Sequence, residues 1–249
     1  MSSPTVETMT ELLEAGVHYG HQTKRWNPKM KDFILEEKNS IYIIDLSITV
    51  NQLAKSAAYL GDVVKGGGKV LFVGTKKQAQ EAVKEAAEAT GQFWVNQRWL
   101  GGTLTNLTTI RKSVARLREF EENEKTPAFA RMNKAEASAL RREATKLRRN
   151  LEGVLNMDKL PDAIVIIDTN REGIAVAEAA RLKIPVVAIV DTNCDPEKID
   201  YPIAGNDDAI RSIRVILQKL VDAIVQAKGI RTKVAAPAPA ESDLEAVSE

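Results

Sequence analysis

Short runs of apolar residues, each followed by a segment that favours a helix, constrain the fold of this chain more than any other feature. Every residue of three runs is apolar, as expected for strands buried on both faces: Val70–Val73, Ala163–Ile167 and Val186–Val190. A shorter run covers residues 93–95, and the helical segments cover 76–90, 172–182 and 207–227. This alternation predicts an α/β fold, a doubly wound parallel sheet with helices on both faces.

Smaller elements are predicted before this alternation. Residues 8–15 have the spacing of a helix capping box and predict a short helix that ends at Gly16. Residues 33–35 and 41–44 predict a hairpin of two strands. Residues 45–64 carry apolar side chains at helical spacing and predict a longer helix.

The segment from residue 105 to 157 interrupts the alternation. Apolar residues recur there at spacings of three and four in two series that Thr126-Pro127 separates. This pattern predicts an inserted antiparallel coiled-coil hairpin. Between residues 111 and 149 there are twelve Lys/Arg and six Glu, a local net charge of +6. We expect such a hairpin to reach across a large, negatively charged partner, although an ordinary solvated coiled coil has the same pattern.

The predicted organisation is a sheet domain of residues 1–104 and 158–228, the inserted hairpin 105–157, and a tail. Residues 229–249 are rich in Ala, Pro and acidic residues, which is typical of a disordered acidic tail. The single cysteine, Cys194, excludes an internal disulfide and a four-cysteine zinc site. With no secretory signal and no apolar stretch of about 20 residues, we expect a cytoplasmic protein without a membrane partner.

Residues 17–31 form a basic loop in which cations alternate with planar rings. The loop holds four Lys/Arg, two His, one Tyr and one Trp, and no acid, whereas the whole chain has a net charge of only +1. Cations neutralise phosphates and rings stack on bases, so this composition favours RNA binding; a solvated basic loop is the alternative. The candidate RNA-binding residues of the loop are His18, His21, Lys24, Arg25, Trp26, Lys29 and Lys31.

A second candidate RNA-binding site precedes the hairpin. Arg98 and Trp99 are followed by the pair Gly101-Gly102, and we expect this turn to join the sheet to the hairpin and to place Arg98 near RNA. A purely packing role for Trp99 at this hinge is equally consistent with the sequence. The predicted set is completed at the start of the hairpin by Arg111, Lys112 and Arg116.

Four aspartates raise the alternative of a divalent-cation site. Asp168 and Asp191 follow apolar strands, and Asp207-Asp208 begins the last predicted helix, so the four carboxylates can meet at one edge of the sheet. A nearby His18 or His21 would favour zinc. The structural interpretation is favoured: Asp207 and Asp208 would stabilise the helix start, and Asp168 and Asp191 would cap turns. We therefore expect no required cofactor.

An enzyme on a doubly wound fold is the main functional alternative. No G-x-G-x-x-G follows a strand, no G-x-S-x-G is present, and residues 74–77 lack the spacing of a phosphate-binding loop. We expect no catalytic residues. A nucleotide- or metal-dependent enzyme remains the alternative, and a generic α/β scaffold whose hairpin binds protein is the third.

Three blocks of sequence resemble the bacterial small-subunit ribosomal protein S2 family. The first comprises residues 12–22, 25–30 and 41–46, the second 96–106, and the third runs from 161–162 through 191–193 to 205–209. Together the resemblance spans about residues 8–228. Lys183 is a small departure, because the family usually has Gly at this position.

This resemblance implies both a fold and a role. It implies an α/β domain with a protruding coiled-coil hairpin, in a ribosome-bound structural constituent of the small subunit. It further implies binding to small-subunit rRNA, contacts with other small-subunit proteins, and help in recruiting the large S1-type ribosomal protein that captures mRNA.

Overall fold

The computed structural model describes residues 4–229, and the predicted tail beyond Gly229 lies outside the described residues. Its centre is a parallel five-stranded sheet in the order β5-β4-β6-β7-β8. The strands are β4 (Val70–Val73), β5 (Phe93–Val95), β6 (Ala163–Ile167), β7 (Val186–Val190) and β8 (Tyr201–Ala204). The predicted α/β fold is confirmed, but β8 was not predicted.

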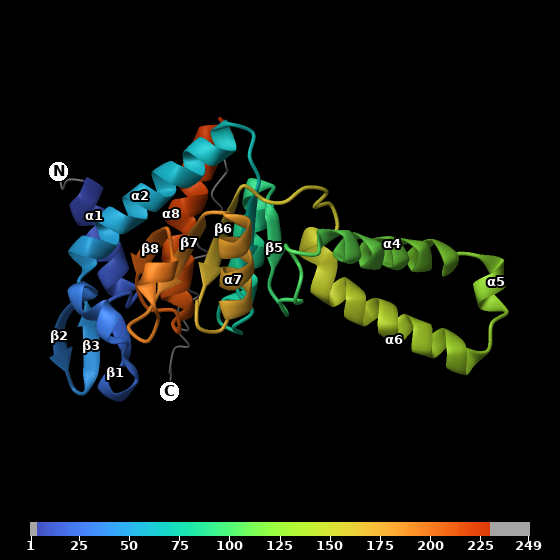
Figure 1. Cartoon of the computed structure of the whole chain (residues 1–249), viewed down its shortest axis with the longest axis horizontal. Helices are drawn as coiled ribbons and strands as arrows, with labels where there is room; N and C mark the ends of the chain where they lie inside the picture. The colour runs from blue at the N-terminus through green and yellow to red at the C-terminus, as the bar shows by residue number, and fades with distance from the viewer. Residues whose placement is uncertain (1–3, 230–249) are drawn as a thin grey trace, which may run out of the picture.

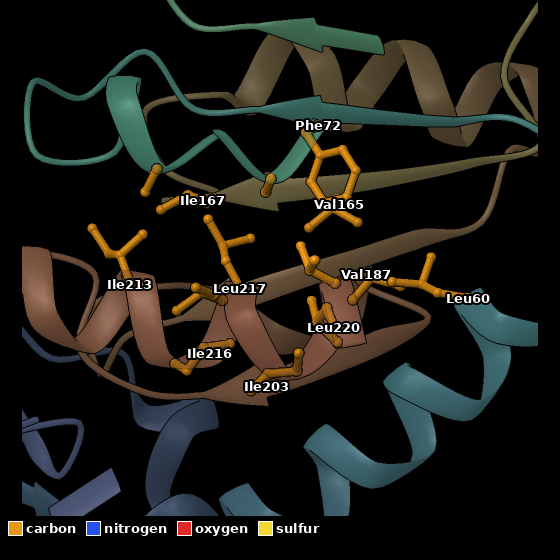
Figure 2. Packing of buried hydrophobic residues seen from close by; sticks show 14 of the residues in the cluster. Leu60, Phe72, Val165, Ile167, Val187, Ile203, Ile213, Ile216, Leu217 and Leu220 are labelled. Carbon is orange, nitrogen blue, oxygen red and sulfur yellow. The ribbon is translucent and has the colours of Figure 1, made fainter. Parts of the chain in front are cut away.

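Two apolar clusters cover the two faces of this sheet. On one face, Phe72, Val165 and Val187 pack against α8 (Ile210–Lys228) and α2 (Leu46–Lys65), with α3 (Gln80–Thr90) beside them. Figure 2 shows these side chains between the sheet and Leu217 and Leu220 of α8. The alternate residues of the same strands, such as Leu71 and Ile164, face α7 (Gly173–Leu182) on the other side. The strands are therefore buried on both faces.

The N-terminal part forms a second, antiparallel sheet at one end of the molecule (Figure 1). Its strands, in the order β1-β3-β2, are β1 (Tyr19–Gln22), β2 (Ile34–Lys38) and β3 (Ile41–Ile44). The hairpin of β2 and β3 was predicted, whereas β1 lies inside the segment that we expected to be a loop. Before it, α1 (Pro4–Glu14) begins before the predicted capping box, so the predicted helix start at Thr8 is wrong.

The inserted hairpin projects from the opposite end of the molecule (Figure 1). It consists of α4 (Leu107–Asn123), the short α5 (Pro127–Ala130) and α6 (Lys134–Leu151). Its distal seam is formed within the hairpin by Leu117 and Ala144, which are buried. At its base, Val114 and Leu151 belong to the apolar cluster under α7, so the root of the hairpin shares a core with the sheet.

Candidate nucleic-acid interface

The N-terminal sheet is held on the carboxyl ends of the central strands by a close backbone contact. A side chain at Gly20 would lie 2.5 Å from Cγ2 of Thr192, so only glycine allows β1 to approach the loop after β7. The His21 N–H donates to the Thr192 hydroxyl at 2.9 Å, and the Asn27 N–H donates to the Thr192 carbonyl at 2.7 Å. These contacts fix where the basic loop can lie.

The loop presents three exposed cations. Lys24 and Arg25 lie in a 3₁₀ turn (Thr23–Arg25), and Lys31 lies in the next one (Pro28–Phe33). Among residues 4–229, none of these three side chains forms an ion pair or hydrogen bond. Their charges therefore face solvent and are accessible to an external anion, although Arg25 also lies near enough to Asp208 to lower the pKa of that carboxyl group.

Lys29 differs from the other cations of the loop. Its ammonium group lies 3.1 Å from the Asp195 carboxylate and also pairs with Glu197. These two hydrogen-bonded carboxylates raise the pKa of Lys29. Lys29 thus fastens the loop to the turn that follows β7, and its charge is already balanced.

The rings of the loop are partly used inside the protein. Trp26 packs on Tyr42 of β3, with ring centroids 5.1 Å apart. His18 lies against Tyr19, its Nδ1 is buried, and burial lowers its pKa. Trp26 therefore packs against the N-terminal sheet, while stacking of either ring on RNA stays a prediction.

The turn at the base of the hairpin is organised by one buried carboxylate. Glu178 of α7 accepts hydrogen bonds from the Trp99 indole, the backbone N–H groups of Gly102, Leu104 and Thr105, and the Thr105 hydroxyl, at 2.8 to 3.0 Å. Burial alone would raise the pKa of Glu178, but these donors lower it. Trp99 is only 8% exposed, so it lies in the core and leaves Arg98 on the surface beside it.

A groove with a basic lining opens between this turn and α6. It encloses about 750 Å³, and its cationic side chains are Arg98, Arg142, Lys146 and Arg149. Arg149 is oriented by a 2.8 Å hydrogen bond from its Nε to Gln97. Arg98, Arg142 and Lys146 have no carboxylate partner within the described part of the chain. No acidic residue lines the groove.

Some of the predicted cations of α4 are unpaired and one is ion-paired within the hairpin. Arg111 and Lys112 are exposed, and neither forms an ion pair with any described residue. Arg116 instead pairs with Glu143 of α6 at 3.0 Å, which ties the two helices of the hairpin together. Part of the positive charge of the hairpin is therefore neutralised by ion pairs between its own helices.

The four aspartates do meet at one edge of the sheet, around Lys76. The strand order changes direction between β4 and β6, and the loops after these two strands carry Lys76 and Asp168. The Lys76 ammonium lies 2.7 Å from Asp207, 2.5 Å from Asp208 and 3.4 Å from Asp168. Burial lowers the pKa of Lys76, but the carboxylates outweigh this effect and hold the pKa well above its ordinary value.

His21 of the N-terminal sheet contacts this cluster of four aspartates. Its Nδ1 lies 3.1 Å from Asp191, which is fully buried, and its Nε2 lies 3.3 Å from Asp208. Of the two candidate histidines, only His21 reaches the carboxylates. Nearby, burial raises the pKa of the Cys194 thiol to about 11, which makes it a poor nucleophile.

The structural explanation offered for Asp207 and Asp208 is wrong. The last helix, α8, begins at Ile210, and it is Asn206 whose side chain accepts from the backbone N–H groups of Asp208 and Ala209. Asp207 is instead buried among other charges. Asp168 does act as a turn cap, because its side chain accepts from the Arg171 N–H at 3.1 Å.

A family comparison bears on what this arrangement is for. The family model described as "Ribosomal protein S2" matches residues 12–227, which includes both sheets and the hairpin. The chain belongs to the ribosomal protein S2 family. It is therefore a structural protein of the small ribosomal subunit, and family membership implies association with rRNA and other ribosomal proteins and a non-enzymatic role. Among residues 4–229 of this S2-family chain, no helix is long and apolar enough to cross a bilayer.

Two features of the interface were missed from the sequence. The groove residues Arg142, Lys146 and Arg149 were included only in the total charge of the hairpin, because helical periodicity does not show which outer face turns toward Arg98. Glu178 was missed because a single Glu in an amphipathic helix looks like an ordinary surface residue. Its distinguishing signal is that apolar or small residues surround it on both sides in the sequence.

Proposed function

We propose that this chain binds small-subunit rRNA through two basic surfaces, one at each end of the molecule. The first is the loop surface of Lys24, Arg25 and Lys31. The second is the groove of Arg98, Arg142, Lys146 and Arg149. We include with it Arg111 and Lys112, two exposed cations of α4. The geometry of the strand ends does not support the enzyme alternative, because the Lys76 ammonium group is ion-paired with aspartates and does not face a phosphate pocket.

The observation that carries this proposal is the groove. Three exposed cations without carboxylate partners line a concave surface of about 750 Å³ that no acid enters. In a solvated coiled coil, such cations would be expected to pair with neighbouring carboxylates, as Arg116, Arg141 and Arg148 do on other parts of the hairpin. A phosphate backbone supplies the missing negative charge.

The groove is tested by measuring the affinity of the chain for purified small-subunit rRNA over a series of salt concentrations. Replacing Arg142 and Lys146 with Gln should weaken binding and reduce the salt dependence by roughly one counterion per lost contact. A control variant with Lys55→Gln and Lys65→Gln removes the same charge from exposed positions of α2. Equal effects of the two double variants would reduce the result to net charge and contradict the proposal.

The loop surface has an internal control in Lys29. Replacing Lys24 and Arg25 with Gln should lower the salt dependence by roughly two counterions, since both cations face solvent. Lys29→Gln should change it less, because Asp195 and Glu197 already hold that ammonium group. If Lys29→Gln had the larger effect, the loop would have to open on RNA, and the proposed surface would be wrong.

We also propose that the chain helps to recruit the S1-type ribosomal protein to the small subunit. This proposal rests on the family resemblance. Subunits assembled without the chain should lack the S1-type protein, and adding the purified chain back should restore it, as quantified by mass spectrometry of sedimented subunits. Normal amounts of the S1-type protein on depleted subunits would contradict this role.

A further inference from the structure

The basic groove at the root of the hairpin contains apolar surface as well as cations. Ile174, in the first turn of α7, lines the groove and is 61% exposed. Leu100, from the turn that precedes the hairpin, lines it as well and is partly buried. Single exposed apolar side chains are common on protein surfaces, but Ile174 lies in a concave site beside several cations. The groove therefore offers a ligand both positive charge and an apolar contact surface.

The cations of the groove lie in a row. Arg142, Lys146 and Arg149 lie on one face of α6, at intervals of three or four residues. With a rise of about 1.5 Å per residue, they extend over about 10 Å of the helix axis. A single phosphate group cannot match charges spread over this length, whereas successive phosphates of a polynucleotide can. The row therefore fits the backbone of a nucleic acid better than a small anion.

Two side-chain amides in the groove have unused hydrogen-bonding groups. Asn150 of α6 lines the groove, and its side chain forms no hydrogen bond with any other residue of the range 4–229. Gln97 accepts from Arg149 through its Oε1, and within the same range no group accepts from its amide nitrogen. An amide can both donate and accept, so it can pair with the edge of a nucleobase. The groove thus holds polar groups suited to a base next to an apolar surface.

Continuous double-stranded RNA cannot use these groups. Its bases are stacked inside the helix, and side chains cannot read its deep, narrow major groove. An unpaired nucleotide instead exposes both the face and the edge of its base. The groove encloses about 750 Å³, within the range of about 300–1,000 Å³ that is typical of sites for small ligands. Its size and lining therefore match a base that has left the RNA helix.

We propose that the groove binds an unpaired nucleotide of the RNA. The base packs on Ile174 and hydrogen-bonds to Asn150 and Gln97, while the flanking phosphates pair with the row of cations on α6. This inference rests on the proposed function of the groove and specifies the RNA structure that it recognises. The phosphates contribute the salt-dependent part of the affinity, and the base contributes a part that does not depend on salt.

A series of model RNAs separates the base from the backbone. Three RNA hairpins of otherwise identical sequence are titrated with the full-length chain, and binding is followed by fluorescence anisotropy. One has a continuous stem, one has a single unpaired nucleotide in the stem, and one has an abasic residue at that position. We expect the unpaired base to raise the affinity about tenfold over the abasic RNA, with the same salt dependence. Equal affinity for these two RNAs would overturn the inference and leave the proposed function in place.

A pair of variants tests the apolar contact. Ile174→Ser should lose the preference for the unpaired base and keep the wild-type affinity for the continuous stem. Ile210→Ser is the matched control, because Ile210 lies in the first turn of α8 and is 53% exposed. It should retain the preference. A preference that survives in Ile174→Ser, or that is lost equally in both variants, would overturn the inference.

Failure of the proposed function gives a different result. With Arg142 and Lys146 replaced by Gln, all three RNAs should bind more weakly. Wild-type affinity of this double variant for every RNA would contradict the basic groove itself and the inference with it. Poly-glutamate, an acidic chain without bases, is added as a competitor. If it displaced the RNA with the unpaired base as readily as the abasic RNA, the groove would recognise charge alone, and the inference would be wrong.

Discussion

Glu178 shows how much of the interface depends on a single residue. Replacing it with Gln keeps the shape but turns one acceptor oxygen into a donor that faces N–H groups. We expect the variant to lose on the order of 3 kcal/mol of unfolding free energy, because charge-assisted hydrogen bonds are broken in a buried place. Urea unfolding measures this loss. Glu81→Gln, at a mostly exposed position, is the control and should change stability by less than about 0.5 kcal/mol.

The pH dependence of the same residue has a definite sign. Because the pKa of Glu178 is lowered in the folded state, its contribution is present at pH values above its ordinary pKa of 4.5 and is lost as the pH falls through the lowered value. The stability difference between wild type and Glu178→Gln should therefore be large at pH ~7 and shrink below pH ~4. A difference that stayed constant over this range would show that the carboxylate charge is not what matters.

At the scale of single residues, the chemistry of a side chain can be read from the sequence, but the partner that it contacts cannot. Lys29 was predicted to contact RNA, and its ammonium group is ion-paired within the protein. For Trp99 the sequence left RNA contact and a packing role at the hinge open, and the side chain is buried. Both outcomes depend on residues more than 70 positions away in the chain, Asp195 and Glu178. Local patterns carry no information on such partners.

The end of α7 gives a prediction at the scale of an element. Lys183 follows the helix with a φ of +56°, a left-handed conformation that glycine adopts without cost, and the family resemblance places Gly at this position. We expect Lys183→Gly to raise the unfolding free energy by about 1 kcal/mol. Gly91→Ala, at the left-handed end of α3, should lower it by a similar amount. Thermal unfolding of both variants checks the pair, and a loss of stability in Lys183→Gly would contradict the argument.

The hairpin separates into a root and an arm. Removing residues 119–145 and closing the gap with a short Gly-rich linker should leave a cooperative unfolding transition, because the arm has its own seam. Leu151→Ala should instead cost about 2–5 kcal/mol, since Leu151 is 2% exposed and packs in the core under α7. Denaturant unfolding followed by circular dichroism distinguishes them. Loss of the transition in the shortened chain would show that the arm belongs to the core.

Strands with a fully apolar sequence were predictable, whereas the edge strand β8 and the strand β1 were not. Residues of β4, β6 and β7 are almost completely buried, so their sequences are continuous apolar runs. The edge strand β8 contains Pro202 and a half-exposed Tyr201, and such a run does not stand out. β1 contains a glycine and polar residues, because it is formed by docking on Thr192 rather than by its own propensity.

At the scale of the whole molecule, the exposed tip of the hairpin serves as a probe of RNA binding. Lys125 and Arg131 are exposed on either side of α5, so trypsin should cut the free protein there early. Small-subunit rRNA should slow this cleavage, as followed by gel electrophoresis. With Arg142 and Lys146 replaced by Gln, the same protection should require more RNA. An unaltered cleavage rate at saturating RNA would mean that the hairpin points away from the nucleic acid.

The double attachment of the hairpin has a mechanical consequence. With 17 residues, α4 is about 25 Å long, and it projects away from the sheet domain (Figure 1). At the root of the hairpin, Leu151 packs in the apolar cluster under α7, and Glu178 accepts hydrogen bonds from the turn that precedes α4. A slight rotation at the root becomes a large excursion at the tip. The contacts of Glu178 and Leu151 therefore limit how far the tip of the hairpin can move.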